Sequence, residues 1–320
     1  MRKWLRIVGI VVGILVALGV GVLTWAYLTA SNYYEHTWTT HDATFAIPFP
    51  LSAADASTLA PGADPAVEAL ARAVGRGKHL VETRYSCNSC HGRDLGGSTV
   101  ISSPFIGVWA APNLTTGPGS VTQGFTALDW DRAVRHGIRH SGKTSSMPVT
   151  EFRAMSDHEL SDIVAYIRSL PPVDRQMPPV RLGPLFSFLL ATDRDATLVT
   201  YTIDHQASHA AEPPPLAASK ELGQHIAQVC TGCHGPRFSG GAIAGDPGMP
   251  VVANLTMHET GLKGWTEADF LRAMQQGRRK DGTEIKPQMP WRQLGQMGET
   301  ELKAVWAFLQ TLPPVEKGNH

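Results

Sequence analysis

The sequence has 320 residues, which is enough for two domains of ordinary size, and its 28 lysines and arginines balance its 28 aspartates and glutamates. A formal net charge of zero excludes a strongly basic nucleic-acid-binding protein, so any electrostatic docking must depend on local patches.

The first predicted element is a transmembrane helix. Residues 7–30 contain no charged side chain, and as a helix they would span about 36 Å, more than the roughly 30 Å core of a bilayer. Three basic residues precede them, which places the N-terminus in the cytoplasm. A cleaved signal peptide is the alternative, but its apolar core is usually only about 7–15 residues long. We therefore expect an uncleaved anchor over residues 1–30 and an extended segment over residues 31–63.

The first predicted domain covers residues 64–173 and is helical. Apolar residues recur at helical spacing over residues 64–82. The stretch "TALDWDRAVRHG" begins with Thr and a nearby acid and ends at Gly, as a short helix does. The stretch "SDHELSDIVAYIRSLPPV" is amphipathic and ends at a proline pair that cannot continue a helix.

A proline-rich linker is expected over residues 174–216, because it contains "PP" at 178–179 and "PPP" at 213–215. Its apolar stretch at residues 182–190 is too short to span a membrane. We expect this stretch to pack between the two domains, with a docking surface as the alternative.

The second predicted domain, residues 217–320, repeats the first. "APNLT" at 111–115 matches "VANLT" at 252–256, and "SLPPV" at 169–173 matches "TLPPV" at 311–315. The offset between the copies is nearly constant, so only short loop insertions separate them. The chain therefore contains two copies of one unit, too few and too long for a solenoid.

All four cysteines lie in two motifs of the form Cys-x-x-Cys-His. These motifs are Cys87-Cys90-His91 and Cys230-Cys233-His234. A structural zinc site usually has two Cys-x-x-Cys knuckles about 15–20 residues apart, and a thioredoxin-like pair has no need of the histidine. Covalent haem attachment uses every feature, because both thiols add to the haem vinyl groups and the histidine binds the iron. The sequence predicts two haem c groups, with His91 and His234 as proximal iron ligands.

The order of these features resembles class I cytochrome c: a helix, Cys-x-x-Cys-His, an Asn-Leu-Thr loop, a short helix, Met-Pro and a C-terminal amphipathic helix. The tandem arrangement is similar to the membrane-anchored diheme c-type cytochromes of bacteria, which are related to cytochrome subunits of periplasmic dehydrogenases. Such subunits often have three attachment sites, whereas this chain has two. The resemblance covers about residues 70–316. It implies an all-α fold with a transmembrane helix followed by two tandem class I cytochrome c domains.

The resemblance also implies a methionine as the distal iron ligand of each domain. Met147 and Met289 are matched across the repeat, and each is followed by proline. Another Met-Pro pair begins at Met249, but it lies too close to its motif histidine and is not matched in the first domain. By the same resemblance, Pro112 lies where a backbone carbonyl would hold the first proximal histidine, whereas the second domain has Ala253 there.

Other polar residues near the expected haems have less specific roles. Asn113 and Asn254 either bond a haem propionate or close their loop, and the sequence favours neither role. His136 and His140 are four residues apart, a spacing that can bind metal on a helix. Because Gly137 lies between them, a continuous helix is not expected, and we expect both histidines to be solvated.

These features predict an electron carrier, not an enzyme, tethered to the bacterial inner membrane with its haem domains in the periplasm. We expect redox proteins as partners: a dehydrogenase or quinol-oxidising complex as donor, and a terminal oxidase or soluble cytochrome as acceptor. Nucleic acid is not expected. A diheme peroxidase is the alternative function, but it needs one haem with an open distal position, which two matched His/Met sites disfavour.

Overall fold

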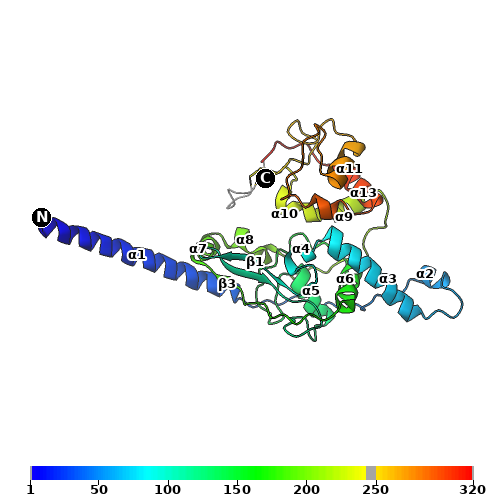
Figure 1. The fold of residues 1–320 in the computed structure, drawn as a ribbon, viewed down its shortest axis with the longest axis horizontal. Coiled ribbons are helices and arrows are strands. Elements are labelled where there is room, and N and C mark those ends of the chain that lie inside the picture. Colours follow the sequence, from blue (N-terminus) through cyan, green and yellow to red (C-terminus); the bar gives the residue numbers. More distant parts are fainter. Residues whose placement is uncertain (1, 243–249, 319–320) are drawn as a thin grey trace.

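The computed structural model describes residues 2–242 and 250–318, so Met249 lies outside the described residues. Figure 1 shows one long helix, α1, projecting from a body made of two mostly helical units. The first unit is coloured cyan to green and the second yellow to red. This arrangement confirms the expected fold of an apolar N-terminal helix followed by two mainly helical domains.

Helix α1 (Arg2–Tyr34) is long and apolar enough to cross a membrane by length and composition. Almost all of its side chains are exposed, and its buried residues, Ala26, Ala30 and Tyr34, lie at its C-terminal end. A helix that is apolar all round and has no protein cover needs lipid around it. The geometry of α1 is therefore consistent with membrane anchoring.

The first domain is built mainly from helices. They are α2 (Ala53–Ser57), α3 (Pro65–His79), the π-helical turn η1 (Leu80–Arg84), α4 (Asn88–His91), α5 (Ala127–Arg135) and α6 (Asp157–Ser169). Helix α3 begins at Asp64, whose side chain accepts a backbone N–H, with a proline at the first helical position. Helices α5 and α6 both begin with a capping box, as their Thr or Ser followed by an acid predicts.

A small antiparallel sheet was not predicted from the sequence. Its strands are β1 (Ser98–Ser103), β2 (Gly107–Ala111) and β3 (Arg181–Leu182), in the order β1-β2-β3. Strand β3 comes from the expected linker, and Val108 of β2 pairs with Arg181. The segment after the first domain is thus hydrogen-bonded back to that domain.

The rest of this segment packs near the base of α1. It contains α7 (Pro184–Thr192), α8 (Arg194–Thr197) and η2 (Val199–Thr202). Leu190 of α7 joins Ala30 of α1 in a small apolar core, and Phe186 packs edge-on against Trp109 of β2 with ring centroids 4.5 Å apart. The expectation that residues 182–190 pack between the two domains is wrong. They cover apolar surface at the end of α1 and on the sheet instead.

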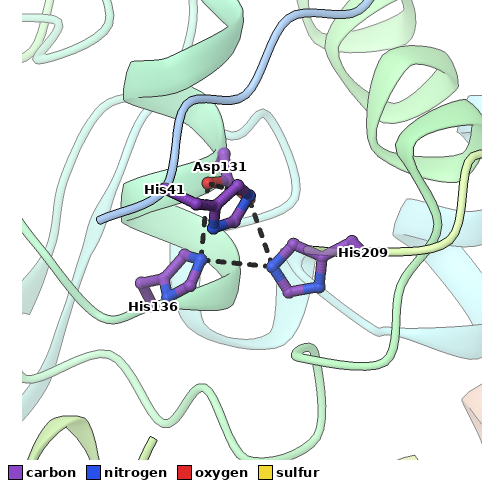
Figure 2. A group of neighbouring side chains, drawn as sticks. All are labelled: His41, Asp131, His136 and His209. Atoms are coloured by element: carbon purple, nitrogen blue, oxygen red, sulfur yellow. Dashed lines mark hydrogen bonds and ion pairs between the residues drawn. The ribbon is translucent and has the colours of Figure 1, made fainter. Parts of the chain in front are cut away.

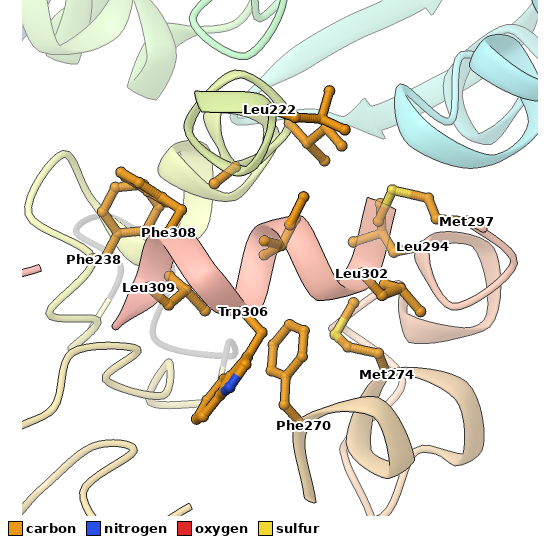
Figure 3. Packing of buried hydrophobic residues seen from close by; sticks show 14 of the residues in the cluster. Leu222, Phe238, Phe270, Met274, Leu294, Met297, Leu302, Trp306, Phe308 and Leu309 are labelled. Atoms are coloured by element: carbon orange, nitrogen blue, oxygen red, sulfur yellow. The ribbon is translucent and has the colours of Figure 1, made fainter. Parts of the chain in front are cut away.

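The second domain has its own core (Figure 3). Its helices are α9 (Lys220–Ile226), the turn η3 (Ala227–Cys230), α10 (Thr231–His234), α11 (Glu267–Gln276), α12 (Trp291–Leu294) and α13 (Glu299–Leu309). Figure 3 shows α13 between Leu222 of α9 on one side and Phe270 and Met274 of α11 on the other. Phe270 stacks on Trp306 of α13, with ring centroids 5.5 Å apart.

In both domains the helix before the haem motif crosses the last helix at a glycine. A Cβ atom at Gly77 of α3 would lie 1.9 Å from the backbone oxygen of Asp162 in α6. A Cβ atom at Gly223 of α9 would lie 1.9 Å from the backbone oxygen of Ala304 in α13. Only a residue without a side chain permits this approach, so the glycine sets the distance between the two helices.

Candidate haem sites

Each Cys-x-x-Cys-His motif folds into a short helical turn that ends at the histidine. Cys87 caps α4, which ends at His91, and Cys230 caps α10, which ends at His234. Burial raises the pKa of the Cys87 thiol and of the Cys230 thiol to about 12. Among the described residues, the one group arranged to hold a metal ion contains no cysteine. The geometry therefore gives no support to a zinc site shared between the motifs.

The histidines of the two motifs, which are the candidate proximal ligands, are held in the same way. The Nδ1–H of His91 donates to the backbone oxygen of Pro112 at 2.9 Å, and that of His234 donates to the oxygen of Ala253 at 2.8 Å. Burial lowers the pKa of both imidazoles, so both are neutral. This tautomer leaves Nε2 as the ligand atom, which is the arrangement an iron-binding histidine needs. Ala253 serves as well as Pro112, because only its backbone takes part.

The chain turns sharply after each histidine. Gly92 and Gly235 follow with φ of 82° and 73°, and Leu95 and Phe238 have φ of 53° and 57°. A left-handed backbone at a residue with a large side chain costs about 1–3 kcal/mol and is retained where the surroundings determine it. Here the left-handed backbone places the side chains of Leu95 and Phe238 in the cores of their domains, where they are 1% and 4% exposed. The two loops thus share an unusual conformation next to the motif.

Asn113 and Asn254 each close the loop whose backbone carbonyl accepts the hydrogen bond of the motif histidine. Both are buried, and their Nδ2 atoms donate to the backbone oxygens of Val173 and Val315 at 2.7 Å in each case. They tie the Asn-Leu-Thr loop to the segment that follows the last helix. Of the two roles that the sequence left open, the structure shows loop closure.

The candidate distal ligands are half-buried. Met147 lies in the loop after α5, and Met289 packs at the edge of the second core. Two methionines that compete by position, Met155 and Met297, are 1% and 5% exposed and belong to the apolar cores. The residues of both sites fit haem c: paired cysteines beside a helical turn, a neutral histidine with Nε2 available, and a partly exposed methionine after a matched short helix.

The first domain contacts the second haem motif directly. Glu151, in the turn after Met147, lies so close to Gly232 that a Cβ atom there would be 1.7 Å from Oε1. Gly232 is the residue before Cys233 of the second motif. Burial raises the pKa of Glu151. The loop that contains one candidate distal ligand thus abuts the other attachment turn.

A buried charge network joins the domains. Arg84 of η1 donates to Glu159 of α6 at 2.5 Å and also to Glu301 of α13. The ring Nε2 of His225 lies 2.9 Å from Glu159, and that of His79 lies 2.7 Å from Glu301. Burial acts to raise the pKa of Glu301, but the bond from His79 and the charge of Arg84 prevail and lower it to about 2. The Glu301 carboxylate is therefore ionised at neutral pH in its contact with Arg84 of the first domain.

One prediction about the other histidines is wrong. His136 is not solvated but 0% exposed, whereas the side chain of His140 is 61% exposed and pairs with Asp129. His136 caps α5 and faces polar residues from segments outside the repeat unit, including His41 and His209. Sequence reasoning missed these two because their segments lie far from α5 in the chain.

The comparisons with known proteins agree with this geometry. The cytochrome c family model matches residues 74–171 and 220–313. The chain is 25% identical to a diheme cytochrome c-type protein of Cereibacter sphaeroides over 72% of this chain and 83% of that protein. It is also 25% identical to the fructose dehydrogenase cytochrome subunit of Gluconobacter japonicus over 75% of this chain, and it spans about half, 52%, of that subunit.

A third relative is the cytochrome c subunit of a quinone alcohol dehydrogenase from Gluconacetobacter polyoxogenes, again 25% identical, over 85% of this chain and 62% of the relative. One of these three relatives is named as a diheme cytochrome and the other two as cytochrome subunits of dehydrogenases. Because the family model matches twice and covers more than half of the sequence, the chain belongs to the cytochrome c family, whose members bind haem c covalently.

Proposed function

We propose that this chain is a single-pass membrane protein that holds two haems and passes single electrons between redox proteins on the periplasmic side. The observation that supports this most directly is the identical orientation of His91 and His234, each by a backbone carbonyl. When bound, haem c supplies a one-electron iron couple that needs no bond to a substrate.

The residues that would hold the two groups are matched between the domains. They are Cys87, Cys90, His91 and Met147 in the first domain and Cys230, Cys233, His234 and Met289 in the second. The cysteines would anchor each group, and the histidine and methionine would fill both axial positions. Filling both positions excludes exogenous ligands, which suits a carrier better than a peroxidase.

The domain interface keeps the two sites in a fixed relation. Arg84, Glu159 and Glu301 are each less than 10% exposed, so their bonds are little screened by solvent. The contact of Glu151 with Gly232 brings the second attachment turn against the first domain. A fixed, close arrangement favours electron transfer within the chain over exchange between separate molecules.

A periplasmic dehydrogenase is the donor we favour, and a terminal oxidase or soluble cytochrome the acceptor. Three of the relatives are named as cytochrome subunits of fructose, alcohol and gluconate dehydrogenases. Tethering by α1 would raise the local concentration of the carrier near such membrane-bound partners.

The haem count tests the proposal. Intact mass and the alkaline pyridine spectrum of the purified full-length chain should give two covalently bound haems, and peroxide turnover with an ordinary electron donor should be negligible. One haem per chain, or rapid peroxide consumption, would contradict the proposal.

Met289→Ala tests the less similar of the two ligand loops, in which "KDGTEIKPQ" precedes the methionine. We expect a lowered reduction potential for one haem and a new spectral response to carbon monoxide in that haem alone. Met257→Ala, at another partly buried methionine of the same core, is the matched control and should leave both unchanged. If Met289→Ala changes neither the reduction potential nor the carbon monoxide response and Met257→Ala changes both, Met257 is the distal ligand instead.

A further inference from the structure

A group of metal-ligating side chains lies outside both haem sites. We call it the three-histidine cluster, and its members are His41, Asp131, His136 and His209. One ligand atom from each residue lies within 4.8 Å of those from the others. Figure 2 shows the four side chains converging on one another from three separate segments. Asp131 and His136 are fully buried, and the side chains of His41 and His209 are 15% and 11% exposed.

We propose that the three-histidine cluster is a closed structural site for a divalent transition-metal ion, with Zn²⁺ as the best match. Imidazole and carboxylate are ligands that zinc takes, and four protein ligands with no open position are typical of a structural site. The cysteines are not involved, so the proposal is independent of the haems.

Three of the separations between ligand atoms lie within about half an ångström of those that zinc imposes. A tetrahedral ion with ligands at about 2.0–2.1 Å sets them about 3.3–3.4 Å apart. His136 Nε2 lies 3.1 Å from His209 Nε2 and 3.4 Å from Asp131 Oδ2. His41 Nε2 lies 3.8 Å from the same carboxylate oxygen. Small side-chain rotations would bring the four atoms onto one ion.

Hydrogen bonds to outer partners fix the tautomers of two of the three histidines, His136 and His41. His205 Nε2–H donates to the backbone oxygen of Thr200 at 3.0 Å, because a carbonyl oxygen can only accept, and the Nδ1 of this neutral ring is then an acceptor. His136 therefore donates its Nδ1–H to His205 Nδ1 at 3.0 Å, which leaves a lone pair on the His136 Nε2 that faces the cluster. His41 likewise turns its Nδ1 to the backbone oxygen of His205 at 3.4 Å. Such outer partners orient metal-binding histidines.

The carboxylate is the second, independent observation. Asp131 Oδ2 is buried and accepts no hydrogen bond from any described residue. Its other oxygen accepts from Arg135 Nε at 2.7 Å, and Arg135 in turn is paired with Asp157 at 2.7 Å. A buried carboxylate oxygen that accepts no hydrogen bond is costly, and the imidazole nitrogens that it faces, His136 Nε2 and His41 Nε2, lie 3.4 and 3.8 Å away. A cation among them would satisfy all of these atoms at once.

The site would join three segments of the chain. His41 lies in the segment after α1. Asp131 lies in α5, and His136 is the C-cap of that helix. His209 lies in the segment that connects the first domain to the second. A metal here would fasten the anchor and the interdomain segment to the first domain. The second domain has Leu271 and Gln276 at the positions matching Asp131 and His136, so it supplies an internal comparison without the ligands.

Metal analysis of the full-length haem-loaded protein, purified without a polyhistidine tag, tests the proposal. We expect about one zinc per chain beside the haem iron. After chelator treatment, calorimetric titration with Zn²⁺ should show one saturable site. Since loss of an outer partner alone costs about 10–100-fold in affinity, His209→Ala should weaken binding by about 100-fold or more. His205→Gln, which changes only an outer partner, should weaken Zn²⁺ binding by about 10–100-fold.

His140→Ala is the matched control, because this exposed histidine lies on the same segment but outside the cluster. It should bind zinc as the parent does, and the haem spectrum should be unchanged in every variant. If His209→Ala fails to fold, His136→Gln, which introduces the residue native to the second domain, replaces it. Absence of metal together with no saturable Zn²⁺ binding would overturn the proposal, and so would equal loss in His140→Ala. Another divalent metal with the same ligand dependence would support the site and replace zinc as its occupant.

Discussion

The two domains differ in what surrounds them more than in how they are built. Both orient the proximal histidine by a backbone carbonyl, close the same loop with an asparagine and cross their terminal helices at a glycine. Among the described residues, only the first domain has a sheet with a strand from the following segment, and only the first has the three-histidine cluster. The shared features surround the Cys-x-x-Cys-His motifs, whereas the unshared ones connect the first domain to α1 and to the segment that leads to the second domain.

The contacts around the motif histidines are thus matched between the two domains, whereas the contacts with the connecting segments differ. Gln276 at the position of His136 shows the point most clearly, because both residues lie at the C-terminal ends of matched helices, yet of the two only His136 has described polar partners from distant segments. The predictions that follow test how separate the two domains are, beginning with the contact that joins them.

Removing Arg84 should have the largest effect. Arg84→Met leaves Glu159 and Glu301 buried without their shared cation, and the loss of one member of a buried ion network typically costs about 3–5 kcal/mol. We expect this loss in the free energy of unfolding by guanidinium, with the two domains unfolding in separate steps. Arg272→Met is the control, because its pair with Asp269 is 40% exposed on the arginine side and contributes under about 1 kcal/mol. Equal effects from the two variants would show that the domains do not depend on this network.

Acid should weaken the same interface. The pKa of Glu301 is about 2 when folded against a usual 4.5, so its stabilising contribution is complete above about pH 4.5 and is lost as pH falls towards 2. A shift of this size corresponds to about 3 kcal/mol at neutral pH. The stability of Glu301→Gln should therefore change less between pH 7 and pH 2.5 than that of the parent. Glu299→Gln, at an exposed pair with Lys303, should keep the parent's slope.

The glycine crossings test whether the two domains are equivalent. Gly77→Ala and Gly223→Ala each force a methyl group against a backbone oxygen, and overpacking of this kind costs about 1–3 kcal/mol. Each variant should lower the thermal stability of its own domain by a similar amount. Gly75→Ala, in the same helix as Gly77 but with nothing within 4 Å, should instead stabilise by about 0.5–1 kcal/mol. If the two variants lose unequal thermal stability, the helix pair with the smaller loss can move apart to accept the methyl group.

Local sequence patterns predicted the helices well. Pro65 and the acids three residues into α5 and α6 mark the starts of their helices within a few residues. The helix-crossing glycines had no such signal, because the backbone they approach lies in the last helix of each domain.

Features built from distant segments were missed for the same physical reason. Strand β3 has only two residues, too few for a periodic pattern, and helices α5 and α6 lie between it and its partner β2 in the chain. His41 and His209 look like isolated polar residues in extended chain, and only the folded structure brings them beside Asp131. Glu151 likewise gives no sign in the sequence that it contacts Gly232.

The smallest predicted effect concerns the two matched helix starts. Thr126 and Thr266 each accept a backbone N–H and bond an aspartate three residues on, which completes a capping box at α5 and α11. Thr126→Ala and Thr266→Ala should each cost about 1 kcal/mol of stability, because an unpaired N–H remains at the helix start. Thr126→Ser and Thr266→Ser keep the hydroxyl and should stay within a few tenths of a kcal/mol of the parent. Since both threonines are exposed, differences in packing contribute little. A markedly larger loss at Thr126 would show that this cap also supports the buried polar residues farther along α5, which the second domain lacks.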